Sequence, residues 1–262
     1  MRINLNRSDR VVLSSRYGGL GDNLQFSTLP RSLKSLGKNV YIRKDSYYRN
    51  QEIRQLVWDL NPYIDGFIES ESNAGDDCEE YRYFGLHDNH TQNVEWSHGL
   101  EPQSDFPELY YTPKKLTHLE NCLVVDISAI SLAAEYSSMQ DAIKKKIDQV
   151  ACNRKVISVK YTNSLLVRPG DAERPRGYTP PNSMFVMQNE IEQVTVSSIF
   201  ELADVLSSCE SVCCLHSGVE VLSLALKKEK FQINSLLSSR EHEKMLSTKL
   251  FYNQHVRYQI LD

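Results

Sequence analysis

The sequence predicts an α/β protein built from two Rossmann-like domains, residues 1–117 and 118–262, which face each other across a cleft. Short apolar runs alternate with segments whose apolar residues recur at helical spacing, and this alternation occurs once in each half of the chain. The apolar residues of segment 69–113 show no sustained periodicity, so this segment is expected to form a functional loop or a connector between the domains. Because such alternation is typical of parallel strands covered by helices, we expect a parallel sheet in each domain.

The first half of the chain contains three expected strands and two expected helices. The strands are at residues 10–16, 40–42 and 66–68, and the helices at residues 22–36 and 47–60. Gly37 is placed to end the first helix, as a glycine just beyond a helix often does. Pro62 marks the end of the second helix, because the residue before a proline avoids the helical region.

The second half restarts the alternation. Strands are expected at residues 122–127, 156–161, 212–215 and 231–233, and helices at residues 131–150, 198–206 and 218–226. The run from Cys122 to Ile127 is almost entirely apolar, which is typical of a parallel strand buried on both faces. Ser197 or Ser198 is expected to cap the second of these helices, with Glu201 placed for a capping box.

The composition excludes several classes of protein. The formal net charge of −4 argues against a nucleic-acid-binding surface, which needs an excess of Lys and Arg over Asp and Glu. No segment approaches the roughly 18 apolar residues of a membrane span, although peripheral contact with a membrane is left open. The N-terminus lacks the apolar core of a signal peptide, and most of the six cysteines lie in or beside apolar segments, so we expect reduced thiols and a cytoplasmic protein.

A glycine-rich turn follows the first expected strand and opens a helix. It contains Gly18, Gly19 and Gly21 and ends in Asp22 and Asn23. Such a turn lets the backbone approach a ligand and directs a helix N-terminus at it. Asp22 repels phosphate, so we expect this acid either to cap the helix or to take a proton from a substrate.

A second turn of this kind, His216-Ser217-Gly218, follows the strand at residues 212–215. In open α/β sheets, ligands collect beyond the carboxyl ends of the strands, which is where both turns are expected. Cys209, Cys213, Cys214 and His216 do not have the spacing of paired zinc ligands, so buried strand residues are favoured over a metal site.

Motifs in both halves of the chain resemble glycosyltransferase family nine, the heptosyltransferase-like proteins of the GT-B fold. The first half has Gly21-Asp22, then Thr28-Leu29-Pro30, and Asn61-Pro62-Tyr63-Ile64-Asp65 before its third strand. The second half has a Leu-Ala helix at residues 201–206, a strand, and then His216-Ser217-Gly218 leading into an apolar helix. His216 stands where the family has an aspartate. The resemblance extends from about residue 10 to residue 235.

This resemblance implies inverting transfer of a sugar, such as a heptose or a hexose, from a nucleotide-diphosphate sugar to a glycan, lipid-linked or protein acceptor, without a metal or other cofactor. Asp22 would be the general base, and the loop at residues 81–113 would line the acceptor side. The donor would contact the second domain through residues of three turns and strand ends: Ser128, Lys160, His216, Ser217, Gly218 and Glu220. Arg168, Arg174 and Arg176, in a loop rich in positive charge, would clamp the phosphates.

Each of these residues also has a structural interpretation. The structural alternatives are a solvated loop for the arginines, a strand-edge position for Lys160 and a structural histidine for His216. Glu220 either accepts from ribose hydroxyls or favours the helix dipole. Three rival functions remain at this point: a non-catalytic sugar- or nucleotide-binding protein, an NAD(P)-dependent oxidoreductase that uses Gly19-Leu20-Gly21, and a nucleotide-sugar epimerase.

Overall fold

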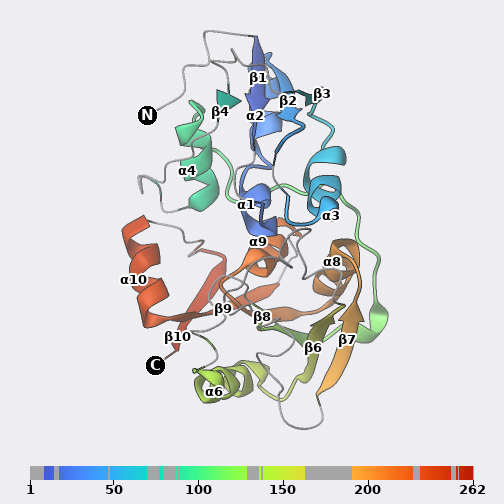
Figure 1. Ribbon diagram of the computed structural model, residues 1–262. Coiled ribbons are helices and arrows are strands. Elements are labelled where there is room, and N and C mark those ends of the chain that lie inside the picture. Colours follow the sequence, from blue (N-terminus) through green and yellow to red (C-terminus); the bar gives the residue numbers. More distant parts are fainter. Residues whose placement is uncertain are drawn as a thin grey trace, which may run out of the picture. The chain divides into compact units, whose positions relative to one another are not determined.

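The structure is a computed structural model of the 262-residue chain (Figure 1). The residues that it describes are 9–14, 18–46, 48–69, 77–78, 87, 89–128, 136, 138–162, 191–226, 231–248, 252 and 254–261. The chain divides into two compact units, Met1–Tyr111 with Met245–Tyr252 and Thr112–Lys244 with Asn253–Asp262. The domain limits and the cleft expected from the sequence stay predictions.

The first unit contains a parallel sheet of four strands in the order β3-β2-β1-β4. Its strands are β1 (Arg10–Leu13), β2 (Asn39–Arg43), β3 (Gly66–Ile68) and β4 (Asp77–Cys78). The three strands expected from the sequence in this half are present, and all the pairings are parallel. Their apolar residues form a core with those of the neighbouring helices, because parallel strands covered by helices are buried on both faces.

The single helix expected at residues 22–36 is two helices, α1 (Leu20–Gln25) and α2 (Leu29–Ser35). The break follows from Pro30, which has no N–H and fits only the first turn of a helix. At the end of α1 the N–H groups of Phe26 and Ser27 bond three residues back, to the carbonyls of Asn23 and Leu24. The helix expected at residues 47–60 begins at Gln51 as α3 (Gln51–Arg54) and continues as a π-helix, η2 (Gln55–Asp59).

Helix α4 (His90–Ser97) lies in the region that the sequence predicted to be irregular. Asn89 caps it by accepting hydrogen bonds from the N–H groups of Thr91 and Gln92. The prediction was wrong because most of the residues that this helix buries are polar, so it has no apolar stripe. Glu95 is one of them, and its carboxylate accepts hydrogen bonds from the N–H groups of Gln103 and Ser104.

The second unit contains a parallel sheet of six strands in the order β10-β9-β8-β5-β6-β7. Its strands are β5 (Cys122–Asp126), β6 (Lys155–Tyr161), β7 (Glu192–Val196), β8 (Ser211–Leu215), β9 (Gln232–Ser238) and β10 (Val256–Leu261). Counted within this unit, the order is 6-5-4-1-2-3, which is the Rossmann order, with its topological switch point between β5 and β8. Neither β7 nor β10 was expected from the sequence.

Helices cover both faces of the second sheet. The described ones are α6 (Gln140–Ala151), α8 (Ile199–Ser208) and α9 (Gly218–Ala225), with the short 3-10 helix η3 (Thr117–Leu119) before β5. Helix α10 (Ser239–Thr248) begins in this unit, and its residues from Met245 on belong to the first unit. Apolar residues of α6 pack with Leu123, Val125 and Cys213 on one face, so the alternate residues of β5 and β8 point to the other face. Helix α9 contacts β8, β9 and α8 on that other face.

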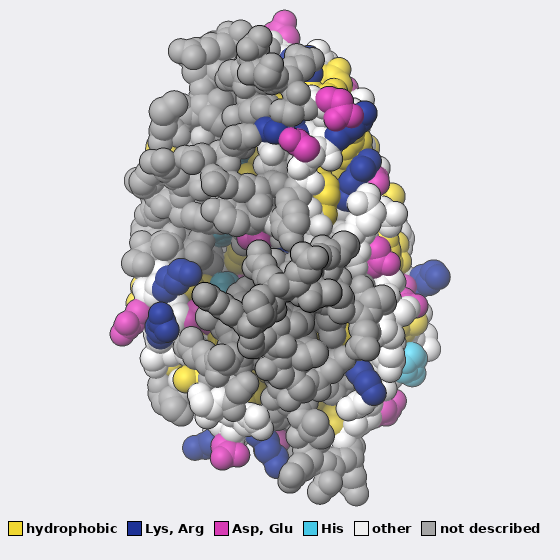
Figure 2. Space-filling view, in the orientation of Figure 1, with side chains coloured by type: hydrophobic (Ala, Val, Ile, Leu, Met, Phe, Trp, Pro, Cys, Tyr) yellow, Lys and Arg dark blue, Asp and Glu magenta, His cyan; other side chains and the backbone are white. Residues whose placement is uncertain are grey.

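The expected cap of α8 is confirmed. Ser198 is the N-cap residue, and its hydroxyl accepts a hydrogen bond from the N–H of Glu201 at 3.0 Å. The Glu201 carboxylate accepts from the N–H and the hydroxyl of Ser197, so the acid closes the box one residue earlier than expected. On the face that Figure 2 shows, Lys and Arg side chains of the described residues are interspersed with Asp and Glu.

Buried His98 makes the stability of the fold sensitive to acid. It follows α4, donates from Nδ1 to the Val94 carbonyl at 2.7 Å and meets the ring of Phe26 edge-on. Burial lowers the pKa of His98 to about 4, although the hydrogen bond to Val94 opposes this shift. The unfolded chain therefore takes up this proton first as the pH falls.

We predict that the free energy of unfolding falls by about 3 kcal/mol between pH 6.5 and pH 4 because of His98. Urea unfolding at a series of pH values measures this loss. His98→Gln is the matched variant, since it keeps a polar side chain but has no proton to take up. Equal slopes of stability against pH in the two proteins would contradict this account.

Candidate active site

The turn after β1 brings Gly18, Gly19 and Asp22 together near the carboxyl end of that strand. The Gly18 carbonyl accepts a hydrogen bond from the N–H of Arg49 at 2.9 Å, and Gly19 is the N-cap residue of α1. Asp22 is the third residue of the helix, and its carboxylate accepts backbone hydrogen bonds from Gly19 and from its own N–H. The hypothesis that Asp22 is itself the N-cap is therefore wrong. Its carboxylate instead bonds the backbone of the N-cap residue Gly19, as the acid of a capping box does.

The absence of a side chain at Gly19 leaves room for the carboxylate of Asp22. A Cβ at this position would lie 2.5 Å from Oδ2 of Asp22 and 3.8 Å from Cζ of Arg49. The carboxylate and the guanidinium thus both lie against the bare backbone of the turn. Sequence reasoning missed Arg49, because it belongs to the segment before α3 and only the fold brings it to the turn.

The surroundings of Asp22 act on its pKa in opposite directions. Burial raises the pKa of its carboxyl, while the Arg49 guanidinium and the backbone hydrogen bonds oppose part of this shift. A carboxyl group whose pKa is raised toward the working pH takes a proton more readily than an ordinary aspartate. The carboxylate of Asp22 is therefore more basic than that of an ordinary aspartate.

Asn23 supports this turn from the interior. Its side chain is fully buried, its Nδ2 donates to the Gly19 carbonyl at 2.8 Å, and its Oδ1 accepts from the indole N–H of Trp58 at 2.8 Å. Gly21 lies within α1 and contributes no side chain. The contacts that the sequence predicted between this turn and an acceptor stay predictions.

In the second unit, strand β8 is followed by His216 and Ser217, and α9 begins at Gly218. Ser217 is the N-cap residue, and its hydroxyl accepts from the N–H of Val219 at 3.3 Å. The backbone N–H of His216 donates to the Leu236 carbonyl at 3.1 Å. The His216 side chain keeps 21% of its surface exposed, and its Nδ1 lies 2.9 Å from Oε2 of fully buried Glu220.

A row of polar residues crosses the sheet beside this loop. Asp126 of β5 pairs with Cys214 of β8, Cys214 with Ser235 of β9, and Ser235 with Tyr258 of β10. The hydroxyl of Ser235 donates to Oε2 of Glu220 at 2.5 Å, and that of Tyr258 donates to Oε1 at 2.8 Å. The sequence missed Ser235 and Tyr258, because it placed the end of β9 at residue 233 and did not predict β10. A contact between Glu220 and ribose stays a prediction.

The end of β5 carries another buried acid. Asp126 accepts a hydrogen bond from the N–H of Ser128 at 2.8 Å and a second from the hydroxyl of Tyr161. Burial raises the pKa of its carboxyl, and these hydrogen bonds oppose the shift. Lys160 is exposed and lies on the opposite face of the sheet from Tyr161, since successive side chains of a strand alternate. Asp126 and Tyr161 therefore hold Ser128, whereas Lys160 takes no part in this cluster.

The topological switch point lies between the group around Asp126 and Ser128 and the group around Glu220 and His216. The chain leaves the neighbouring strands β5 and β8 at the same edge of the sheet, through Ser128 on one side and His216-Ser217-Gly218 on the other. Helices of a doubly wound sheet diverge at this point, and ligands bind in the crevice that results. The structure thus places Ser128, His216, Ser217 and Gly218 at one edge of the sheet, with Glu220 bonded to His216.

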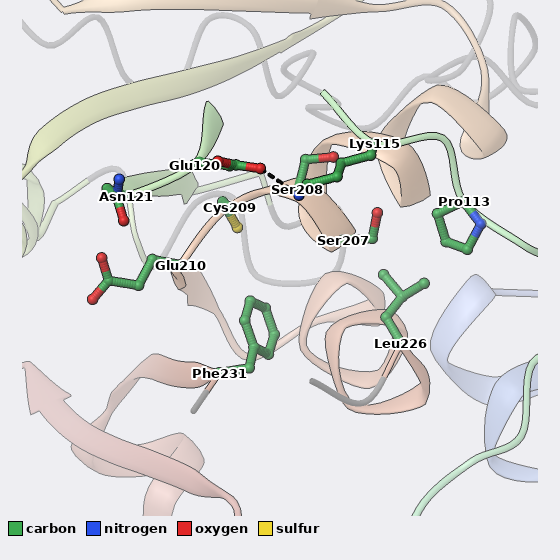
Figure 3. Close-up of a pocket in the computed structure, with 10 residues that line it drawn as sticks. All are labelled: Pro113, Lys115, Glu120, Asn121, Ser207, Ser208, Cys209, Glu210, Leu226 and Phe231. Carbon is green, nitrogen blue, oxygen red and sulfur yellow. Dashed lines mark ion pairs between the residues drawn. The ribbon is translucent and has the colours of Figure 1, made fainter. Parts of the chain in front are cut away.

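A cavity of about 610 Å³ lies at the other edge of the second sheet (Figure 3). Its lining residues precede the strands or follow the helices: Pro113, Lys115, Glu120, Asn121, Ser207, Ser208, Cys209, Glu210, Leu226 and Phe231. Lys115 and Glu120 form an ion pair across it at 2.6 Å. This is the amino-terminal edge of β5 and β8, away from the switch point, so we do not assign the donor to this cavity.

Several predicted residues lie elsewhere. Arg168, Arg174 and Arg176 are outside the described residues. His90 and His98, expected on the acceptor side, are buried. Within the part of the chain that the structure describes, no three His, Cys, Asp or Glu side chains are arranged to hold a metal, and no helix is long and apolar enough to cross a membrane.

No family model matches the chain, and no curated protein matches its sequence. Solved structures do match. The glycosyl transferase family 9 protein from Veillonella parvula matches with a TM-score of 0.57 and 11% identity, over 96% of this chain and 85% of that chain. The ADP-heptose lipopolysaccharide heptosyltransferase II of E. coli matches with a TM-score of 0.55 and 9% identity, over 96% and 89% of the two chains.

The iron-containing dodecameric glycosyltransferase TibC from enterotoxigenic E. coli also matches, with a TM-score of 0.55 and 14% identity. The match covers 86% of this chain but only 57% of TibC. The chain shares the fold of these glycosyltransferases. The GT-B-like α/β fold that the motifs predicted is therefore confirmed, with a parallel sheet in each unit.

The close contact at Gly19 predicts a strong coupling between Gly19 and Asp22. Gly19→Ala should destabilise the protein by about 1–3 kcal/mol, because the new methyl group displaces the carboxylate. In an Asp22→Ala background the same substitution should cost less, since Oδ2 is gone. A double-mutant cycle from urea unfolding measures the coupling, and an additive cycle would contradict this geometry.

The charge of Arg49 should hold down the pKa of Asp22. We predict that Arg49→Gln raises this pKa further, because burial then acts without an opposing cation. NMR titration of the Asp22 carboxyl carbon measures the change. Arg54→Gln is the matched control, since Arg54 pairs with Asp59; a shift as large in the control would remove Arg49 from this role.

Proposed function

We propose that this chain is a glycosyltransferase, which moves a sugar from a nucleotide-diphosphate sugar to a glycan, lipid-linked or protein acceptor by inverting transfer without a metal. The observation that carries the proposal is the position of Ser128 and His216-Ser217-Gly218 at the switch point of a Rossmann-type sheet. A nucleotide bound there has its phosphates close to the start of α9. The fold shared with family 9 glycosyltransferases supports the same function.

The second unit is proposed to bind the donor. Ser217 and Gly218 open α9, where the helix dipole and N–H groups favour a diphosphate. Ser128 offers a hydroxyl on the other side of the switch point. Arg168, Arg174 and Arg176 are further candidates for contacts with the phosphates.

The first unit is proposed to activate the acceptor. Asp22 takes the proton of the acceptor hydroxyl as the oxygen attacks the anomeric carbon, and the bond to the departing phosphate breaks. Attack from the face opposite the leaving group inverts the anomeric configuration. Gly18, Gly19 and Gly21 let an acceptor approach the backbone of the turn.

The donor to test first is ADP-D-β-D-heptose. TibC has been solved in complex with this sugar nucleotide, and E. coli heptosyltransferase II is described as an ADP-heptose enzyme. At identities of 14% and 9%, other nucleotides and a hexose belong in the same panel. An oxidoreductase is disfavoured, because the position that would need the third glycine of a dinucleotide motif holds the fully buried side chain of Leu24.

We predict that ADP, GDP or UDP species raise the melting temperature of the protein, since a ligand that binds only the folded state stabilises it by about 2.7 kcal/mol at a concentration of 100 times its Kd. A thermal-shift panel with NAD(P) and free nucleosides measures this. Stabilisation by NADP alone would reject the glycosyltransferase proposal. Binding of a nucleotide sugar without any turnover would favour the non-catalytic alternative.

Asp22→Asn should leave nucleotide affinity near that of the wild type and reduce turnover by at least about 100-fold, because the amide cannot accept the acceptor's proton. Slow hydrolysis of the donor, with water as the acceptor, provides a readout that does not require the natural acceptor. Asp9→Asn is the control, since this aspartate has 96% of its side chain exposed. Unchanged turnover of Asp22→Asn would remove Asp22 from the mechanism.

A further inference from the structure

The buried carboxylate of Glu220 is the centre of a hydrogen-bonded relay. Both of its oxygens are occupied within the second unit: Oε1 accepts from Tyr258 at 2.8 Å, and Oε2 accepts from Ser235 at 2.5 Å. Oε2 also lies 2.9 Å from Nδ1 of His216. A carboxylate with no exposed surface is stable only when such partners replace water.

This relay fixes one imidazole ring. The backbone of His216 is anchored to Leu236, its Nδ1 is bonded to Glu220, and the ring of Tyr258 meets it edge-on at 6.5 Å between centroids. The bond to Glu220 assigns the proton of Nδ1, so Nε2 is the nitrogen left for a ligand. Among the residues that the structure describes, none is bonded to Nε2, and the side chain keeps 21% of its surface exposed.

The charges around His216 favour its protonated form. Burial alone lowers the pKa of the imidazole, but the Glu220 carboxylate, its hydrogen bond to Nδ1 and the charge of Glu241 on α10 outweigh this effect. Lys244, also on α10, opposes them, and Tyr258 faces the ring from β10 without a charge at neutral pH. The net shift of the pKa of His216 is upward.

We infer that Glu220, held by Ser235 and Tyr258, keeps His216 as an imidazolium whose Nε2–H binds the diphosphate of the donor and protonates it as it departs. This inference rests on the proposed function. His216 is then the group that touches the leaving phosphate, and the other three are positioning residues. No lysine or metal is needed for this contact, because a charge-assisted hydrogen bond supplies it.

The proton balance of the step is simple. The bond between the anomeric carbon and the phosphate oxygen breaks, and its electron pair stays on that oxygen. The acceptor oxygen bonds the anomeric carbon, and its proton passes to the general base. The proton of Nε2 passes to the departing phosphate, and solvent returns a proton to the neutral imidazole after the nucleoside diphosphate has left.

NMR titration of the His216 ring tests the relay in the absence of any ligand. We expect the pKa of His216 to fall in Glu220→Gln, which removes the charge, and to shift in Tyr258→Phe, which deletes only a hydroxyl bonded to the same carboxylate. Tyr258→Phe keeps the test available if Glu220→Gln does not fold. A pKa of His216 that does not move in either variant would overturn the relay.

Calorimetric titration with ADP at several pH values tests the ligand contact. The wild-type affinity should weaken roughly tenfold as His216 loses its proton, whereas His216→Gln should show only the pH dependence of ADP itself. His118→Gln, an exposed histidine in the same unit, is the control and should follow the wild type. A pH profile unchanged in His216→Gln overturns this inference and leaves the proposed function standing, while absence of binding by ADP, GDP and UDP at every pH overturns both.

Discussion

The parallel register of the second sheet is the constraint on which its chemistry depends. Because all six strands run in one direction, their carboxyl ends meet at one edge, and the pairing aligns Asp126, Cys214, Ser235 and Tyr258 in a single row. A slip of one residue in any strand would turn its member of the row to the face that α6 covers. The polar cluster and the α9 loop therefore exist only in this register.

Each unit holds a carboxylate near the end of a strand, partly buried in the first unit and fully buried in the second, with a basic side chain beside it. In the first unit Asp22 lies against Gly19, with Arg49 nearby. In the second unit Glu220 is bonded to His216. The two carboxylates differ in the number and kind of hydrogen-bond partners that they have. Glu220 has three side-chain partners, whereas the backbone hydrogen bonds and the nearby cation of Asp22 leave its pKa raised.

The cavity of Figure 3 and the polar clusters lie at opposite edges of the second sheet. The cavity at residues 113–121, 207–210, 226 and 231 is at the amino edge, where Lys115 and Glu120 neutralise each other. The buried acids, the histidine and the start of α9 are at the carboxyl edge. Doubly wound sheets bind ligands at the carboxyl edge, because helix N-termini and divergent loops gather there.

Much of the fold was predictable because it follows from patterns among neighbouring residues, such as apolar periodicity and helix capping. The strands at residues 40–42 and 66–68, the buried strand beginning at Cys122 and the cap at Ser198 all follow from periodicity and capping chemistry within a few residues. Helix α4 was missed because its buried face is polar. Strand β10 was also missed, because its position in the sheet depends on pairing with β9 and not on a local pattern. The two glycine turns and Asp22 were found for the same local reason.

The sequence by itself determined the alternation of strands and helices, the parallel sheets and the turns at which a ligand is expected, since each depends on neighbouring residues. Only the tertiary structure decided which side chains meet at those turns. Ser235 is 15 residues from Glu220 and Tyr258 is 38 residues away, and the register of β8, β9 and β10 alone brings their hydroxyls to one carboxylate. Likewise, Arg49 reaches Asp22 only because its segment packs on the first turn. Contacts between distant segments depend on strand pairing and packing, which no local pattern specifies.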